Sequence, residues 1–228
     1  MNNLGRINVI YFCPIYGNSF NCFSDDNFSY GGNLSSSRIR TGAANQTIID
    51  KWNTVPIPSA PELKPVKIDP KTTALLILDM ETSICKSPRC IASIPNINNL
   101  LTRARKNNML VVYSLIPMGN PSDILEQLTP LRGDPIVKST VDKFYKTNLE
   151  KILQRKGIKT VIVTGYAANG AVLHTATAAA FRGYNVIVPV DGMSANDPYA
   201  EQYTAWHMLN SPGTRGRVTL TKTNLISF

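Results

Sequence analysis

One carboxylate stands where an apolar run ends, and its position in this sequence suggests chemistry. Asp79 directly follows the apolar segment 75–78, which reads LLIL. Burial raises the pKa of a carboxyl group and a nearby cation lowers it, so a carboxyl in this place can act as a general acid or a general base. The alternative is an Asp that only caps the following loop, and the residues alone weigh the two interpretations about equally.

A second informative stretch is Gly165–Val172, which reads GYAANGAV and leads into an alanine-rich segment. Asn169 is the predicted N-cap of a helix there. The N–H groups exposed after it would form an anion or oxyanion site. The alternative is a tight strand-to-helix turn without a ligand. The sequence lacks the glycine-rich nucleotide-binding motifs, so we predict no nucleotide.

The elements that must position these residues alternate along the chain. Apolar runs predict strands at 73–79, 110–115, 160–164, 185–190 and 217–221, and helical patterns lie at 95–108, 122–128, 147–157, 170–182 and 198–210. This alternation predicts an α/β fold, a three-layer α/β/α architecture with a doubly wound, mainly parallel sheet. Ligands in such folds bind outside the carboxyl ends of the strands, where Asp79 and Thr164–Asn169 fall.

The beginning of the chain differs from the rest. Residues 1–45 are rich in Asn, Ser and Gly and follow no period, so we expect a disordered or removable leader, with residues 46–228 as the domain. The prolines of segment 56–70 predict an extended arm. No apolar run approaches the ~20 residues that span a bilayer, so we expect no membrane partner.

The formal net charge of +9 is not concentrated in one place. Its clusters, such as Arg103–Lys106 and Arg155–Lys156, fall at the ends of predicted helices, where cations complement the helix dipole. Solvated helix ends are therefore favoured over a nucleic-acid surface, and we expect no nucleic-acid partner. A net positive field favours a small anionic substrate.

Cys85 and Cys90 are close enough in sequence to close a small disulfide loop in an oxidising compartment. That pairing would indicate an exported or periplasmic protein. Two free thiols in a reduced cytoplasm are the main alternative. A zinc pair is a weaker one, because no second pair of ligands follows at a useful spacing.

Three segments, in this order along the chain, resemble the isochorismatase-like hydrolases, a family of cysteine hydrolases. Leu75–Asp79 resembles the strand that ends in the catalytic Asp of the family. Lys138, with Phe144 six residues later and then Thr147–Glu150, resembles the segment of the family lysine. Val161–Gly165, running into the alanine-rich helix, resembles the turn that carries the nucleophile.

The resemblance covers about residues 47–228 and implies a catalytic set. In the family an Asp takes the proton of a cysteine thiol, a Lys orients the Asp and the substrate, and the thiolate attacks an amide or a similar carbonyl. Carried over, these positions are Asp79, Lys138 and Ala171. The chain thus departs from the family pattern at the nucleophile, where it has alanine.

The resemblance also implies where a substrate or an oxyanion binds. The N–H groups of Ala167 and Ala171 would hold the oxyanion, next to a cis peptide bond expected between Tyr166 and Ala167. The resemblance implies that Tyr166, Asn169 and Gly170 of this turn bind substrate or oxyanion as well.

Alanine at position 171 closes the covalent route, because a methyl group cannot attack a carbonyl. The leading hypothesis is a hydrolase of a small anionic metabolite that uses acid–base chemistry, as family members that act on vinyl ethers do. The alternative is a catalytically inactive small-molecule binding protein on the same scaffold. An engineered Cys→Ala change in an amidase ranks last.

The resemblance bears on cofactors and partners as well. Metal-binding nicotinamidases of the family add an Asp and two His near the catalytic Asp, and no His lies near Asp79. We therefore predict no metal and no other cofactor. The expected partners are a small-molecule substrate and further copies of the chain, since relatives often form homo-oligomers.

Overall fold

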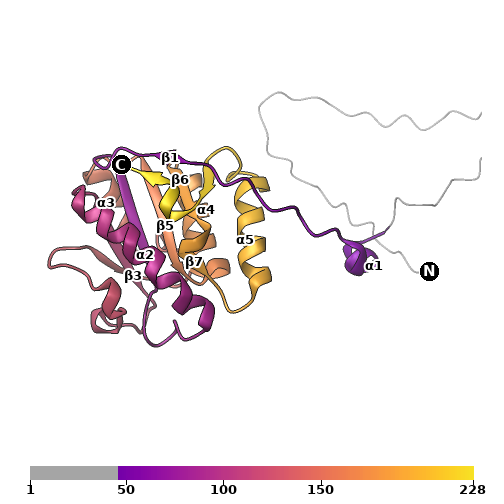
Figure 1. Cartoon of the computed structure of the whole chain (residues 1–228), viewed down its shortest axis with the longest axis horizontal. Coiled ribbons are helices and arrows are strands. Elements are labelled where there is room, and N and C mark those ends of the chain that lie inside the picture. Colours follow the sequence, from indigo (N-terminus) through magenta and orange to yellow (C-terminus); the bar gives the residue numbers. More distant parts are fainter. Residues whose placement is uncertain (1–45) are drawn as a thin grey trace, which may run out of the picture. The chain divides into compact units, whose positions relative to one another are not determined.

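The computed structural model describes residues 46–228 (Figure 1). Pro56–Phe228 form one compact unit, so the domain start predicted at residue 46 lies before the beginning of this unit. A short helix α1 (Ile48–Lys51) and a turn η1 (Trp52–Thr54) precede the unit, and their side chains are exposed. The leader predicted for residues 1–45 lies outside the described residues.

A parallel sheet forms the centre of the unit, in the strand order β4-β3-β2-β5-β6-β8. Its strands are β2 (Thr73–Leu78), β3 (Leu110–Leu115), β4 (Ile136–Lys138), β5 (Thr160–Tyr166), β6 (Asn185–Pro189) and β8 (Val218–Thr221), and β7 (Met193–Ser194) pairs with the end of β5. Every pairing in this sheet is parallel. Two short strands, β1 (Val66–Lys67) and β9 (Ile226–Ser227), pair separately.

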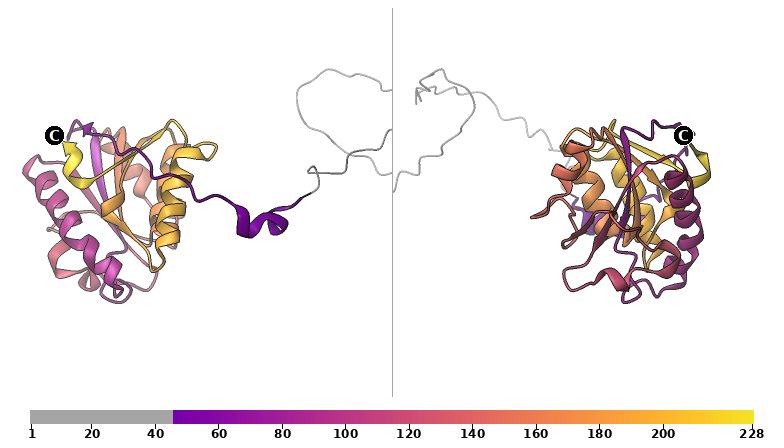
Figure 2. Two further views of the ribbon diagram at one scale, coloured as in Figure 1. Left: turned by 45° about the vertical axis from the view of Figure 1, so that its right-hand side comes forward. Right: turned by 90° about the vertical axis from the view of Figure 1, so that its left-hand side faces the viewer.

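Helices cover both faces of the sheet (Figure 2). The helix α2 (Pro88–Lys106) packs on one face. The other face is covered by α3 (Leu149–Arg155), α4 (Leu173–Phe181) and α5 (Pro198–Asn210). The structure therefore has the three-layer α/β/α architecture that the alternating pattern predicts.

The central strand β2 shows why its sequence is apolar throughout. Leu76 and Leu78 point into the core under α3, α4 and α5, whereas Leu75 and Ile77 point into the core under α2. All four side chains are buried, and burying each stabilises the fold by ~1.5–3 kcal/mol. Because both faces are covered, the first polar side chain of this segment can stand only where the strand ends.

The start of α2 differs from the prediction. The helix begins at Pro88 rather than at Pro95, which lies inside it. Ser87 caps the helix by accepting a hydrogen bond from the N–H of Cys90. A proline inside a helix removes one backbone hydrogen bond. Burial of Cys90 and Ile94 on the same face, one turn apart, offsets that loss.

Two other segments also differ. The short helix predicted at 122–128 is a pair of 3-10 turns, Pro121–Asp123 and Glu126–Leu128. Strand β4 was not predicted, because only Val137 of its three residues is buried. None of the helices in residues 46–228 has the length and apolarity to cross a bilayer.

Candidate active site

The candidate site lies at the carboxyl edge of the sheet, where the neighbouring strands β2 and β5 end at the same level. Leu78 is paired with Gly165, so Asp79 and Tyr166 are the next residues along each chain segment. Asp79 has a left-handed backbone with φ of 51°, a conformation that Asp tolerates better than most residues. Its N–H is held by Ser114, at the end of β3. The prediction that the strand ends bring Asp79 close to the turn after β5 is therefore confirmed.

Gly165 allows the two strands to approach each other. Its φ of 125° is one that other residues rarely adopt, and a Cβ at this position would overlap the carbonyl oxygen of Leu78. Any side chain here would push β5 away from the residue that precedes Asp79. The glycine is thus required by the geometry of the site.

A buried ion pair joins Asp79 to Lys143. Lys143 Nζ lies 2.7 Å from Asp79 Oδ2, and the side chains are 0% and 7% exposed. The other carboxylate oxygen, Oδ1, accepts a hydrogen bond of 2.7 Å from the hydroxyl of Ser114. Both oxygens of the carboxylate are therefore engaged by fixed partners.

The ammonium group of Lys143 is also fully engaged. Besides Asp79 it donates to the backbone carbonyls of Ser139 and Thr140. An ammonium group has three hydrogens, so each has a partner. The backbone N–H of Lys143 donates to the hydroxyl of Thr175 in α4, which fixes the loop against that helix.

The electrostatics of Asp79 combine two opposed effects. Burial raises the pKa of its carboxyl group, while the charge of Lys143 and the hydrogen bonds from Lys143 and Ser114 lower it. Burial is the larger influence, so the pKa lies above its ordinary value. A carboxyl in this state can take up a proton more readily than an exposed Asp.

Lys138 does not have the position that the sequence predicted. It ends strand β4, its side chain is exposed, and Lys143 is the lysine that contacts Asp79. The role of electrostatic partner assigned to Lys138 is therefore wrong in this structure. The reason is tertiary: the loop after β4 turns back through Ser139–Asp142, whose hydrogen bonds bring the later lysine inward.

The turn after β5 contains the expected cis peptide bond between Tyr166 and Ala167. A π-helical turn, Ala168–Val172, follows and leads into α4. Ala171 lies in it and is 3% exposed, next to the kink at Gly170. The position where the resemblance expects a nucleophile is thus a buried methyl group.

Asn169 is not the N-cap that the sequence predicted. It is exposed inside the π-helical turn, and no side chain caps the start of this turn or of α4. The carbonyl of Ala167 accepts hydrogen bonds from the N–H groups of Gly170 and Val172 instead. Backbone donors thus satisfy the turn, because the π geometry brings them to that carbonyl.

Tyr166 and Gly170 border the same turn. Tyr166 is partly exposed and donates its hydroxyl hydrogen to Asn196, at a distance of 2.8 Å. Gly170 faces the side chain of Val141, from the loop that carries Lys143. The structure therefore brings Asp79, Lys143 and this turn together, and leaves Lys138 outside.

Three residues of this region were missed in the sequence. Ser114 was hidden in the apolar run of β3, although a serine next to the end of a buried strand was an available signal. Lys143 is one of several lysines in its loop. Glu81, two residues after Asp79, is 0% exposed and accepts a hydrogen bond of 2.8 Å from the N–H of Ile116. The signal in the sequence that could have revealed Glu81 was a second carboxylate two residues after Asp79.

A disulfide bond joins Cys85 to Cys90, with the α-carbons 5.4 Å apart. It ties the loop after Glu81 to the first turn of α2. In the described part of the chain no three or more His, Cys, Asp or Glu side chains gather in a way that would hold a metal ion.

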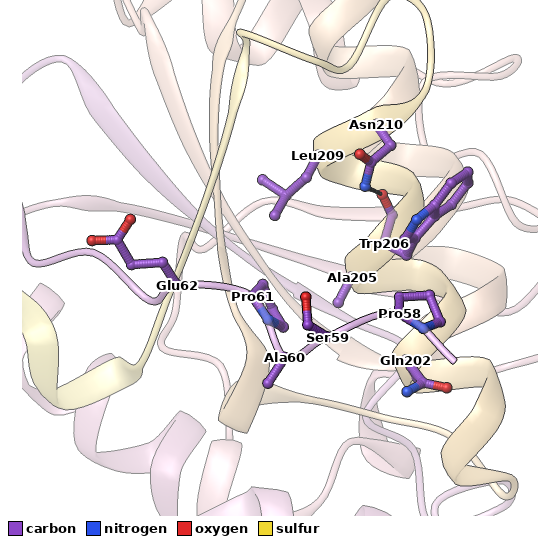
Figure 3. Close-up of a pocket in the computed structure, with 10 residues that line it drawn as sticks. All are labelled: Pro58, Ser59, Ala60, Pro61, Glu62, Gln202, Ala205, Trp206, Leu209 and Asn210. Carbon is purple, nitrogen blue, oxygen red and sulfur yellow. Dashed lines mark hydrogen bonds between the residues drawn. The ribbon is translucent and has the colours of Figure 1, made fainter. Parts of the chain in front are cut away.

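A cavity of about 460 Å³ lies elsewhere, between the proline-rich arm and α5 (Figure 3). Pro58–Glu62 line one side, and residues of α5 such as Trp206 and Leu209 line the other. It shares no residue with the site around Asp79. We therefore assign it no part in the chemistry.

The fold and the site define a doubly wound α/β protein with a buried carboxylate–lysine pair at the strand ends. Residues 73–223 match the model of the isochorismatase domain, and the chain belongs to this family. The relatives that it matches in sequence include an amidase and a protein named an isochorismatase effector, and a nicotinamidase of Bacillus subtilis shares the fold, with a TM-score of 0.59.

Individual relatives differ in how much of the chain they match. The secreted isochorismatase effector Isc1 of Verticillium dahliae is 32% identical over 140 residues, which is 55% of this chain and 74% of that protein. The N-carbamoylsarcosine amidase of Arthrobacter sp is 32% identical over 114 residues, 47% of this chain and 43% of that protein. A cysteine hydrolase from Pseudomonas syringae shares the fold, with a TM-score of 0.63 and 20% identity over 73% of this chain and 95% of its own.

Proposed function

We propose that this protein hydrolyses a small anionic metabolite by acid–base chemistry, without a covalent intermediate and without a cofactor. The observation that carries the proposal is the buried pair of Asp79 and Lys143 beside a turn that has Ala171 at the nucleophile position. In this proposal Asp79 and Lys143 are the acid–base part of the site, and Ala171 takes the position of the family thiol.

Water is the nucleophile in this proposal. A methyl group has no lone pair, and both cysteines of the described residues are joined in a disulfide. Asp79 exchanges protons with the substrate and water. Lys143 holds the carboxylate in place and balances its charge, and the N–H groups of Ala167 and Ala171 stabilise developing negative charge.

An enol ether of the isochorismate type is the substrate class that suits this set. A carboxyl group gives a proton to the terminal carbon of the double bond, and the adjacent C–O carbon becomes an oxocarbenium ion. Water adds to that carbon and loses a proton to the carboxylate. The hemiketal then breaks its C–O bond and releases a ketone and an alcohol. An amide is less suited, since its carbon must first be attacked by a strong nucleophile.

Two further observations support an anionic substrate. The net charge of +9 attracts anions. One relative is named an isochorismatase effector, which agrees with a substrate of the isochorismate type. We extend the same comparison to location and propose that the protein is exported, because that relative is described as secreted and the Cys85–Cys90 disulfide suits an oxidising compartment.

The second candidate function is a small-molecule binding protein without catalysis. It is favoured by the complete hydrogen bonding of the pair, in which both oxygens of Asp79 and all three hydrogens of Lys143 already have protein partners. A site that has lost catalysis would keep the Asp79–Lys143 pair for the stability of the fold. The two candidates differ in whether Asp79 is needed for turnover.

The test is a mass-spectrometric screen of the protein and of Asp79→Asn with isochorismate-like enol ethers, small amides and ureido compounds. We expect enol-ether hydrolysis that falls by at least ~100-fold in Asp79→Asn, the usual contribution of a general acid or base. Turnover that survives Asp79→Asn would refute the mechanism. Binding without turnover in the parent protein would favour the binding protein.

The variant Ala171→Cys is the matched gain-of-function test. It restores a thiol at the turn, so amide hydrolysis should appear in it and remain absent in the parent. Amide hydrolysis by the parent protein would show that the missing thiol does not decide the reaction.

A further inference from the structure

Glu81 is a buried carboxyl group that the proposed reaction does not use. Its side chain is 0% exposed. Oε1 accepts a hydrogen bond from the N–H of Ile116, whereas Oε2 has no hydrogen-bond partner among the residues that the structure describes. A buried carboxylate oxygen without a partner is costly when the group is ionised and much less costly when it is neutral.

The groups that face Glu81 do not neutralise it. Asp79 and Asp123 bring negative charge, and Lys143 is the nearby cation. The three hydrogens of Lys143 are used by Asp79, Ser139 and Thr140, so none is left for Glu81. Within residues 46–228, Glu81 forms no ion pair.

The loop after β3 closes over the unpartnered oxygen. A Cβ at Gly119 would overlap Oε2 of Glu81, and its three nearest atoms all belong to that carboxyl group, so the absence of a side chain there makes room for it. The backbone of Glu81 pairs with Ile124 and fixes the group in this place. Solvent is thereby kept from both oxygens.

We propose that Glu81 keeps its proton while Asp79 exchanges one with the substrate, so that these two carboxyl groups, two residues apart in the chain, are not ionised together. The proposal rests on the function proposed above. The environments of the two groups differ in the required direction, since Asp79 has a lysine and a hydroxyl and Glu81 has one backbone N–H. Glu81 acts through Asp79 and is a positioning residue.

The direction of the pKa agrees with this arrangement. Burial raises the pKa of Glu81, the charges of Asp79 and Asp123 raise it further, and the N–H of Ile116 and the charge of Lys143 lower it. Ionisation of Glu81 would place two negative charges close together against one lysine.

The direct test does not depend on turnover. Carbon-13 NMR of protein labelled at the glutamate carboxyl carbons follows each Glu through a pH titration, and the resonance lost in Glu81→Gln identifies Glu81. We expect that resonance to titrate above the ordinary value of 4.5 and to shift when Asp79 is replaced by Asn. Exposed Glu62 is the reference, and its resonance should not respond to Asp79→Asn. A Glu81 resonance that titrates at 4.5 or ignores Asp79→Asn overturns the proposal.

Stability provides a second readout. A carboxyl group with a raised pKa in the folded state contributes stability that is present below its unfolded value and is lost as the pH rises through its folded value. The free energy of unfolding of the parent should therefore fall relative to Glu81→Gln as the pH rises from about 4.5. Parallel curves for the two proteins would contradict a proton on Glu81.

The functional test uses the pH profile of Asp79-dependent turnover. Glu81→Gln keeps the acceptor for the N–H of Ile116 but cannot ionise. The change in turnover rate that the parent shows at high pH should therefore disappear in this variant, while the substrate KM stays within about twofold. Gly119→Ala, which displaces the carboxyl group without removing it, should shift the pH at which that change occurs. An unchanged profile in both variants overturns the proposal. If the parent shows no turnover, the proposed function fails, but the NMR titration still tests whether Glu81 keeps its proton, because it does not depend on activity.

Discussion

Replacement of Lys143 by methionine tests the feature on which the candidate site depends. The change keeps the length of the side chain and removes the charge. Asp79 then keeps its buried carboxylate with the hydroxyl of Ser114 as its remaining side-chain partner. Removing one partner of a buried ion pair costs about 3–5 kcal/mol, because the other charge stays buried and uncompensated.

The penalty should depend on pH in a defined direction. Without the lysine the pKa of Asp79 rises further above its ordinary value of 3.8, so the carboxyl group binds a proton and loses its charge at low pH. The stability deficit of Lys143→Met is therefore smallest near pH 4 and grows as the pH rises toward 7. Added Asp79→Asn should recover part of the loss, since both charges are then absent.

Urea unfolding of the parent, Lys143→Met and Lys138→Met at pH 4 and pH 7 measures these differences. Lys138 is the matched control, because it is a lysine five positions earlier with an exposed side chain. Its replacement should change the free energy of unfolding by no more than ~0.5 kcal/mol. Equal losses in the two lysine variants, or a Lys143→Met deficit that does not vary with pH, would refute the reasoning.

Two further predictions concern the frame around the site. Gly165→Ala should destabilise the fold by more than ~2 kcal/mol in thermal unfolding, because the new Cβ meets the carbonyl of Leu78. Gly133→Ala is the control: its φ is also positive but the space around it is open, so it should cost about 1 kcal/mol. Similar losses in the two variants would contradict the close approach of β2 and β5 at Gly165. Replacing Cys85 and Cys90 together by Ser should lower the free energy of unfolding by about 2 kcal/mol, which is the entropy that a six-residue disulfide loop removes from the unfolded chain. If the intact mass of the native protein equals that of the reduced form, the disulfide bond does not form.

The layers of the fold follow from the order of apolar runs and helical patterns. The strands at 73–79, 110–115, 160–164 and 185–190 were predictable because a strand covered on both faces must be apolar along its whole length. The start of α2 was not predictable from the sequence. Pro95 is a strong local signal for a helix start, and it was outweighed by a cap at Ser87 and by core packing.

The site was predictable in part. Asp79 and the turn at Gly165–Val172 stand at strand ends, and the strand order alone brings such ends together. The lysine was not predictable, because Lys138 ends β4 and Lys143 lies in the loop directly after it, and no short pattern encodes the path of that loop. Hydrogen bonds between Thr175 and that loop, and between Ser139 and Lys143, select Lys143.

By itself, the sequence determined the fold class, the carboxylate at the end of β2 and the absence of a thiol at position 171. These are properties of residue type and of local period. The tertiary structure decided which lysine meets Asp79 and that the side chain of Glu81 is buried. The physical reason is that the pairing and desolvation of charges depend on the chain segments folded around them, and those segments come from distant parts of the sequence.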